Sequence, residues 1–245
     1  MSLLRSILFA LALVVVTPPF GILALFLGGL APMARYRIIT RWADVAMWCI
    51  AHILGIRYRV VGEENMPKVP AVVLAKHQSA WETIAFQHIL PPVSFVLKRE
   101  LLKIPFFGWG LGRMPFIAID RAAGKDALAQ LVDQGARRMA EGFWVVVFPE
   151  GTRVAPGGTR RYKSGGAWLA HKTGAPVVPI AHNAGEFWGR NAFHKKMGEV
   201  VVSIGPAIQT EGRTAEEITK EARAWIEGEM HRLFPHHYRA GHQED

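Results

Sequence analysis

Residues 69–75 (VPAVVLA) form an apolar run that ends directly at the polar residues 76–82 (KHQSAWE). A second apolar run, 144–148 (WVVVF), ends in the same way at residues 149–153 (PEGTR). Short apolar runs bounded by polar turns are typical of buried strands. In α/β proteins, ligands bind beyond the carboxyl ends of such strands. The two polar segments are therefore expected to meet at one edge of a sheet.

These segments carry residues suited to acid–base chemistry. His77 falls in the turn after the first run, and Glu82 falls in the first turn of the next predicted helix. Histidine accepts a proton near neutral pH, and a nearby carboxylate fixes its tautomer and stabilises the imidazolium. Glu150 and Arg153 after the second run add a charged wall. The pattern predicts a base and an anion clamp that face one substrate.

Each segment also has a purely structural interpretation. Residues 79–82 match a capping box, in which Glu82 only closes the start of a helix and Ser79 is a cap rather than a nucleophile. Residues 148–153 are compatible with a turn that carries a solvated charge pair.

Composition limits the class of partner. The chain has 245 residues, with 29 Lys and Arg against 20 Asp and Glu, and a net charge of +9. Such a charge indicates attraction to an anionic surface. Half of the residues are apolar, the mean hydropathy is +0.14 and eight residues are tryptophan. This combination favours a membrane surface over nucleic acid, for which no binding motif is found.

The N-terminal segment is long enough to cross a bilayer once. Residues 6–34 contain no charged side chain, although Pro18 and Pro19 interrupt the apolar stretch. A single kinked transmembrane helix, a hairpin that enters one leaflet and a signal peptide all fit this pattern, the last one least well. Only Arg5 precedes the stretch, and three arginines follow it at once, which predicts that the C-terminal side is cytoplasmic. These three are Arg35, Arg37 and Arg41.

The rest of the chain predicts an α/β fold. Residues 33–56 have the spacing of a second helix, and residues 104–110 read as an aromatic, glycine-bearing loop. From residue 57 onward strand-like and helix-like stretches alternate, so we expect a largely parallel sheet flanked by helices. Strands are predicted at 57–61, 69–75, 93–98, 116–119, 144–148, 177–181 and 200–204. Helices are predicted at 80–90, 125–141, 165–172 and 215–233, the last one opened by a capping box. Residues 1–56 are predicted to be a membrane-associated helical region, and 57–245 the α/β catalytic domain.

Four motifs, in order between residues 60 and 206, resemble those of the glycerolipid acyltransferases, and within them the bacterial 1-acylglycerol-3-phosphate acyltransferases. The first family motif is His, four residues, then Asp, and here it runs from His77 to Glu82, so Glu replaces Asp. The second motif resembles residues 98–108 together with 119–121. The third is matched throughout by residues 148–153, and the fourth resembles residues 177–180.

The resemblance implies a glycerol-3-phosphate acyltransferase-like fold and an acyl transfer. The acyl chain would pass from acyl-coenzyme A or acyl carrier protein to the sn-2 hydroxyl of lysophosphatidate, giving phosphatidate for phospholipid synthesis. His77 would be the base and Glu82 its orienting partner, and the nucleophile would belong to the substrate. The alternatives are another acceptor such as a lyso-ornithine lipid, a lipid-binding protein without catalysis, and a hydrolase that uses water.

The resemblance also assigns expected substrate contacts. Phosphate would be bound first by arginines, because guanidinium matches phosphate oxygens in a planar, bidentate geometry. The expected contacts are Arg121 and Arg153 to phosphate, Lys98 and Lys163 as further cations, Glu150 to the glycerol part or to Arg153, and Gly151 and Thr152 as backbone donors. The loop at 104–110 would border the acyl chain or simply pack in the core.

No cofactor and no metal are predicted. The ten histidines show no compact ligand spacing, and the pair His236 and His237 is interpreted as surface or structural. Cys49 is the single cysteine and is expected to be an apolar packing residue. The expected location is the bacterial inner membrane, in contact with membrane lipid, with the catalytic domain facing the cytoplasm.

Overall fold

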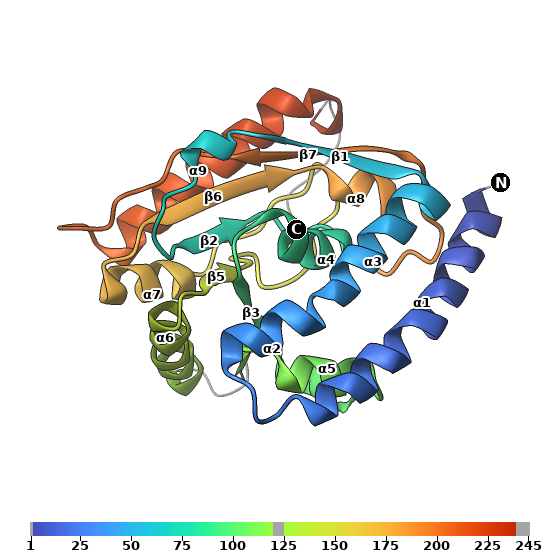
Figure 1. Ribbon diagram of the computed structural model, residues 1–245. Helices are drawn as coiled ribbons and strands as arrows, with labels where there is room; N and C mark the ends of the chain where they lie inside the picture. The colour runs from blue at the N-terminus through green and yellow to red at the C-terminus, as the bar shows by residue number, and fades with distance from the viewer. Residues whose placement is uncertain (1, 120–124, 239–245) are drawn as a thin grey trace.

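A twisted sheet forms the centre of the protein (Figure 1). The computed structural model describes residues 2–119 and 125–238, and within these ranges seven strands are ordered β1-β7-β6-β2-β5-β3-β4. Every neighbouring pair is parallel except β6 and β7, which are antiparallel. The predicted largely parallel α/β fold is therefore confirmed. The strands are β1 Ile56–Val61, β2 Val72–Ala75, β3 Val93–Lys98, β4 Ile117–Ile119, β5 Trp144–Val147, β6 Val177–His182 and β7 Gly198–Ile204.

Helices cover both faces of this sheet (Figure 1). One face packs against α6, α7 and α9, and the other packs against α3 and α4, with α1, α2 and α5 further out. The α-helices are α1 Ser2–Phe26, α2 Pro32–Ile39, α3 Arg41–Cys49, α4 Trp81–Ile89, α5 Phe107–Arg113, α6 Lys125–Ala140, α7 Gly165–Thr173, α8 Ala184–Phe187 and α9 Ala215–Leu233. The predicted capping box of α9 is present, with Thr214 and Glu217 bonded reciprocally.

The two-residue period of the strands divides the core into two layers. In β2, Val72 and Leu74 face the α7 and α9 side, whereas Val73 and Ala75 face the α4 side. All four are fully or almost fully buried, as expected for a strand between two helical layers. This explains why the strand reads as a continuous apolar run rather than an alternating one.

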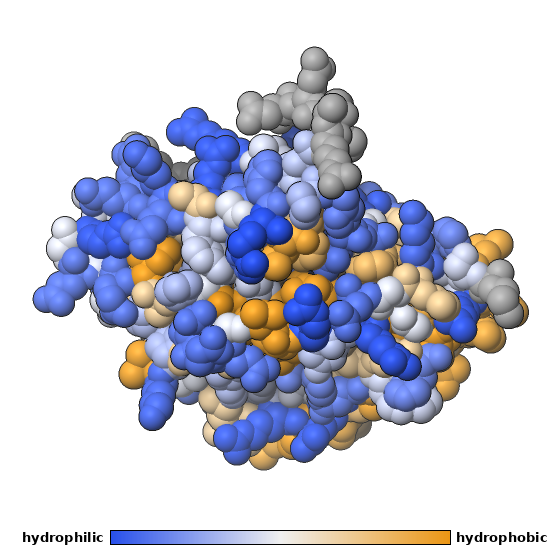
Figure 2. Space-filling view, turned by 90° about the horizontal axis from the view of Figure 1, so that it is seen from above, coloured by the Kyte–Doolittle hydropathy of each residue, from blue (hydrophilic) through white to orange (hydrophobic). Residues whose placement is uncertain are grey.

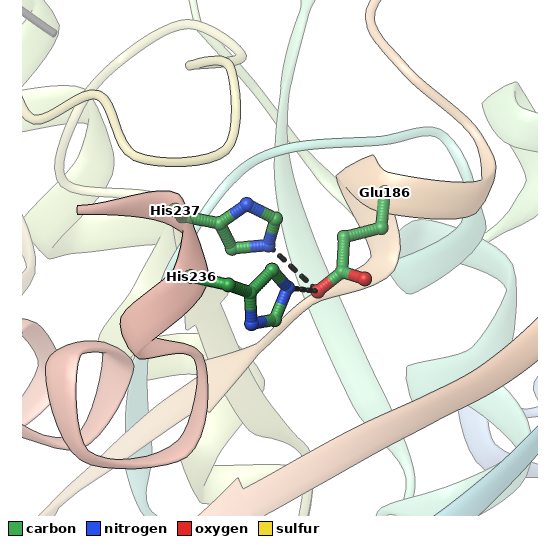
Figure 3. A group of neighbouring side chains, drawn as sticks. All are labelled: Glu186, His236 and His237. Carbon is green, nitrogen blue, oxygen red and sulfur yellow. Dashed lines mark hydrogen bonds and ion pairs between the residues drawn. The ribbon is translucent and has the colours of Figure 1, made fainter. Parts of the chain in front are cut away.

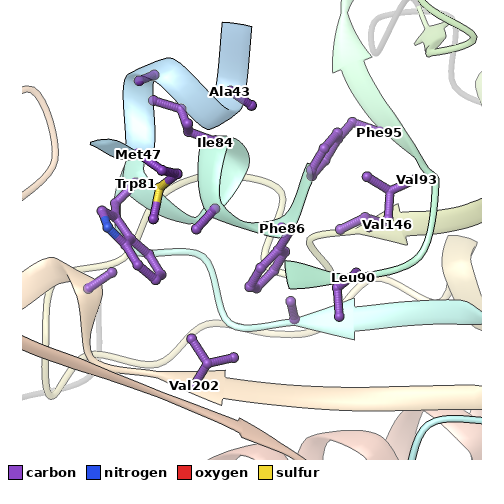
Figure 4. Close-up of a cluster of buried hydrophobic side chains, with 14 of the residues drawn as sticks. Ala43, Met47, Trp81, Ile84, Phe86, Leu90, Val93, Phe95, Val146 and Val202 are labelled. Carbon is purple, nitrogen blue, oxygen red and sulfur yellow. The ribbon is translucent and has the colours of Figure 1, made fainter. Parts of the chain in front are cut away.

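The layer on the α4 side is built from large apolar side chains (Figure 4). Trp81 and Phe86 of α4 have no exposed surface and pack with Met47 of α3 and Phe95 of β3. This packing fixes α4 on the sheet, and α4 carries Glu82 in its first turn. The core thus sets the position of one of the predicted catalytic residues.

The N-terminal region departs in detail from the sequence expectation. Among the three arrangements considered for residues 6–34, the structure has one continuous helix, α1, with Pro18 and Pro19 inside it, and no hairpin of half-length helices. Each proline removes one backbone N–H donor from α1, and the packing of α1 against α3 and α5 supports the helix in this region. The helix predicted at 33–56 is divided into α2, α3 and a π-helical turn, Ile50–Leu54, that ends at the left-handed Gly55. The segment predicted as a loop at 104–110 enters α5, because Phe107–Arg113 is helical.

The outer side of α1 is apolar and exposed. Among the described helices it is the one that is long and apolar enough to cross a membrane. Leu4, Leu11, Val15 and Phe26 each expose more than half of their surface, which is unusual for a helix in water. In contrast, Figure 2 shows a mainly hydrophilic surface when the molecule is viewed from above, with hydrophobic residues gathered near the centre and at the margins.

The predicted division at residues 56 and 57 stays a prediction. Phe9, Ala43 and Met47, which precede it, belong to the same buried cluster as Val73 and Val202 of the sheet. The N-terminal helices are thus packed onto the α/β core.

Candidate active site

Parallel strands bring four polar segments to one edge of the sheet. β2, β3, β5 and β6 run in the same direction, so their carboxyl ends lie together. His77 follows β2, Lys98 ends β3, and residues 148–153 follow β5. β6 ends at His182 and leads into α8. The two segments singled out from the sequence are therefore neighbours in space.

His77 and Glu82 are in direct contact. The Nδ1 atom of His77 lies 2.8 Å from Oε1 of Glu82, and the ring stacks on Phe148 with centroids 4.0 Å apart. The Glu82 side chain is fully buried, and its Oε1 also accepts the backbone N–H groups of Gln78 (2.9 Å) and Ser79 (2.8 Å). Glu82 thus closes the start of α4 and orients His77 at once, so the two interpretations of this residue are compatible.

These contacts define the histidine tautomer. Burial acts to raise the pKa of Glu82, but the hydrogen bonds that its carboxylate accepts from the His77 ring and the Ser79 backbone lower it overall. An ionised carboxylate only accepts hydrogen bonds, so Nδ1 of His77 carries the proton that it donates to Glu82. The other ring nitrogen, Nε2, then has a free lone pair, as a general base requires.

A buried charge network holds the backbone behind His77. Lys76 has no exposed surface, and its Nζ lies 2.8 Å from Oε1 of Glu150 and 2.9 Å from Oε1 of Glu227. The other oxygen of Glu150 accepts the backbone N–H of His77 at 2.9 Å. Glu227 belongs to α9 and also accepts the hydroxyl of Tyr162 at 2.9 Å. Burial raises the pKa of Glu150, and the charge of Lys76 and its hydrogen bond oppose that shift.

His182 contributes a second fully buried imidazole. Its Nε2 lies 2.8 Å from the carbonyl oxygen of Lys76, and its Nδ1 accepts the N–H of Ala184. Nε2 is therefore the protonated nitrogen and donates to that carbonyl. Burial lowers the pKa of His182 and so favours this neutral form. His182, Glu150 and Glu227 thus all bond to Lys76 or His77, the two residues that follow β2.

A cavity of about 890 Å³ opens in front of His77. Most of its lining is apolar, and one wall is the inner side of α1, including Leu13, Pro18 and Phe20. Pro105, Phe106 and Phe107 from the aromatic segment line it as well. A largely apolar cavity lined by a histidine that is paired with a carboxylate suits a substrate that has an acyl chain and one reacting polar group.

The cavity also carries positive charge. Lys98 and Arg153 line it, and so do Arg190 and Asn191, which lie beyond α8 and outside all four motifs. The guanidinium of Arg190 contacts the backbone oxygen of Arg153 at 3.4 Å, so the two arginine segments touch. The cavity lining thus supplies cationic side chains for an anionic group of the substrate.

The remaining predicted residues divide into three groups. Gly151 and Thr152 line the cavity. Glu150 does not; it is buried and contacts Lys76 and His77 rather than the substrate space. Lys163 lies beside this turn, with its backbone N–H bonded to the carbonyl of Pro149 at 2.8 Å. Arg121 lies outside the described residues.

Sequence reasoning missed the roles of Lys76, Glu227 and Arg190. A lysine that directly follows an apolar strand was a visible signal of a buried charge, because such a position is seldom polar without a partner. Glu227 and Arg190 gave no signal, since each resembles an ordinary surface charge until the fold places it.

The comparisons with known proteins identify the family of the chain. The acyltransferase family model matches residues 57–183, more than half of the chain. The 1-acyl-sn-glycerol-3-phosphate acyltransferase of Pseudomonas aeruginosa is 43% identical over 98% of this chain and 96% of its own length. The protein of that name from Saccharomyces cerevisiae is 28% identical over 88% of this chain and 72% of its own length.

A solved structure has the same fold. The crystal structure of the 1-acyl-sn-glycerophosphate acyltransferase from Thermotoga maritima matches with a TM-score of 0.78 at 23% identity, covering 99% of this chain and 98% of that one. The chain belongs to the acyltransferase family, and it is a transferase.

Replacement of Lys76 tests the buried network. Lys76→Met keeps an unbranched side chain, one atom shorter, but leaves Glu150 buried without its cation, so we expect a loss of about 3–5 kcal/mol in the free energy of unfolding. Arg59→Met is the matched control, because Arg59 and Glu199 form an ion pair that is about half exposed and is expected to contribute at most about 1 kcal/mol. Urea unfolding in mild detergent measures both, and similar losses in the two variants would contradict the network.

The pH dependence of stability tests the charge of Glu82. Its pKa is lower in the folded protein than the ordinary value of 4.5. The ionised form therefore stabilises the fold above that value, and the contribution disappears as the pH falls through the folded-state pKa. The difference in unfolding free energy between wild type and Glu82→Gln should be largest at neutral pH and should shrink at acidic pH. A difference that stays constant across this range would mean that Glu82 is already protonated at neutral pH.

Proposed function

We propose that this protein transfers an acyl chain from acyl-coenzyme A or acyl carrier protein to the sn-2 hydroxyl of 1-acylglycerol-3-phosphate. The observation that carries the proposal is the His77–Glu82 pair at an apolar cavity whose cationic residues include Lys98, Arg153 and Arg190. The named bacterial relative at 43% identity supports the same substrate.

The proposed reaction needs one base and no covalent enzyme intermediate. Nε2 of His77 takes the proton of the acceptor hydroxyl as its oxygen attacks the thioester carbon. Glu82 stabilises the imidazolium that forms, as a carboxylate does in a hydrolase triad. The tetrahedral intermediate then collapses, the carbon–sulfur bond breaks, and the leaving thiolate takes the proton from Nε2. The products are the acylated lipid and a free thiol, and His77 is returned to its starting form.

The walls of the cavity account for the lipid character of the substrate. The acyl chain lies against α1 and the aromatic segment, and the phosphate lies at Arg153 and Arg190. Because α1 is both a cavity wall and an apolar outer surface, a lipid acceptor can enter from the membrane without crossing water. We propose that α1 places the protein in the bacterial inner membrane with its catalytic domain on the cytoplasmic side, where the arginines after α1 lie.

The base assignment is tested by thiol release from oleoyl-coenzyme A, with and without lysophosphatidate, using purified protein in detergent. His77→Ala should lower the acceptor-dependent rate by about 10²–10⁴-fold, the usual contribution of a general base. The exposed His52 is the matched control, and His52→Ala should retain activity. Near wild-type activity in His77→Ala would rule out His77 as the base.

The same assay distinguishes the other activities. Thiol release without acceptor would identify a thioesterase. If no thiol is released, the assay is repeated with acyl carrier protein donors and with a lyso-ornithine lipid as acceptor.

The phosphate clamp is tested with acceptors that differ by one group. Arg153→Ala and Arg190→Ala should each raise the KM for lysophosphatidate about tenfold or more, since a hydrogen bond to a charged group contributes about 1.5–3 kcal/mol. With monoacylglycerol, which lacks the phosphate, the same variants should behave like wild type. Arg137→Ala in α6, on the opposite face of the sheet, is the control. Equal effects of Arg190→Ala on both acceptors would show that Arg190 does not bind phosphate.

A further inference from the structure

Two histidines and one glutamate from distant parts of the chain converge at the surface (Figure 3). Glu186 belongs to α8, and His236 and His237 form the short turn Pro235–His237 that follows α9. The Nε2 atom of His237 lies 2.6 Å from Oε1 of Glu186, and Nε2 of His236 lies 3.3 Å from the same oxygen. All the ligand atoms lie within 4.8 Å of one another.

This donor set has the chemistry of a transition-metal site. Two imidazole nitrogens and one carboxylate oxygen are ligands that Zn²⁺ takes, with a water as the fourth ligand in open sites. Bond lengths near 2.0–2.1 Å place the ligand atoms of a tetrahedral Zn²⁺ about 3.3 Å apart. The separation of His236 from Glu186 already matches this spacing, and His237 would have to move outward by less than about 1 Å.

The carboxylate is held in position from behind. The side-chain amide of Asn183 donates to Oε1 of Glu186 at 2.9 Å, and Asn183 is itself buried. Its amide oxygen accepts the backbone N–H of Val201 at 2.9 Å, which fixes it to β7. Polar groups that orient a ligating side chain in this way are a regular feature of metal sites. Oε1 has a lone pair for Asn183 and another for a metal ion.

We propose that Glu186, His236 and His237 bind a divalent transition metal ion, with Zn²⁺ as the fitting case. The site is distinct from the cavity at His77, and it does not depend on the proposed acyl transfer. The sequence does not reveal it because Glu186 and His237 are 51 residues apart. Only the return of the chain after α9 toward the end of β6 brings them together.

The position of the site gives the metal a structural role. It joins the turn after α9 to α8, whose Gly185 N–H bonds to the side chain of Gln78, next to His77. Tyr238 directly follows the turn, stacks on His231 of α9 and packs against the core cluster formed by α7 and α9, so the turn is attached to the core on this side. A bound ion would hold the turn after α9 against α8, and α8 contacts the loop that carries His77.

The test measures metal binding directly. The full chain, purified in detergent without a histidine tag and stripped with EDTA, is titrated with Zn²⁺ by calorimetry, and bound zinc is counted by elemental analysis after dialysis. Wild type should bind one Zn²⁺ per chain, and saturating Zn²⁺ should raise its melting temperature, because the ion binds the folded state. The double variant His236→Ala and His237→Ala should bind at least tenfold more weakly and lose the thermal shift.

Two further variants separate ligand loss from damage to the fold. Glu186→Gln keeps the size and the oxygen acceptor but removes the charge, so it should weaken Zn²⁺ binding while the stripped protein keeps its melting temperature within a few degrees. His171→Ala in α7 removes an exposed histidine outside the cluster and should bind Zn²⁺ like wild type. Equal binding by wild type and the double variant, or no binding by wild type, would overturn the proposal.

Discussion

The ion pair between Lys76 and Glu150 holds together the edge of the sheet that carries the candidate active site. It joins the segment after β2 to the segment after β5, and neither charge has exposed side-chain surface. A buried N–H group beyond the end of a strand needs a partner outside the sheet, and Glu150 supplies one for His77. Since Lys76 also bonds to Glu227, the helix α9 on the far face is connected to the same loop. The position of His77 therefore depends on charges that never face the cavity.

The two carboxylates around His77 have separate tasks. Glu150 fixes the backbone of His77, and Glu82 fixes its ring. The first-motif glutamate, longer by one methylene than the family aspartate, reaches the ring and two backbone N–H groups from the first turn of α4. The backbone N–H groups in this turn would otherwise lack partners at the helix start. Its contacts thus combine helix capping with orientation of the ring.

The helix α1 is apolar on its outer side, where the exposed face of a helix in water is usually polar. α1 lies along the cavity on its inner side and exposes large aliphatic side chains on its outer side. A helix with apolar side chains on both sides favours a position where lipid, not water, surrounds it. The helix that lines the cavity is therefore also the element that we propose as the membrane contact, so the proposed substrate access and the proposed anchoring depend on one helix.

The sequence by itself determined the α/β class, the approximate strands and helices, and the pairing of His77 with Glu82. An apolar run shows over a few residues that a strand is buried. His77 and Glu82 are only five residues apart, so the turn and the start of the next helix bring them into contact. Local sequence is therefore enough to predict both features. The tertiary structure decided the partners of Lys76, of which Glu227 is 151 residues away, the entry of Arg190 into the cavity, and the meeting of Glu186 with His236 and His237. Such contacts depend on the order of strands in the sheet and on the path of α9. The sequence around a charged residue does not indicate which distant charged residue it will contact.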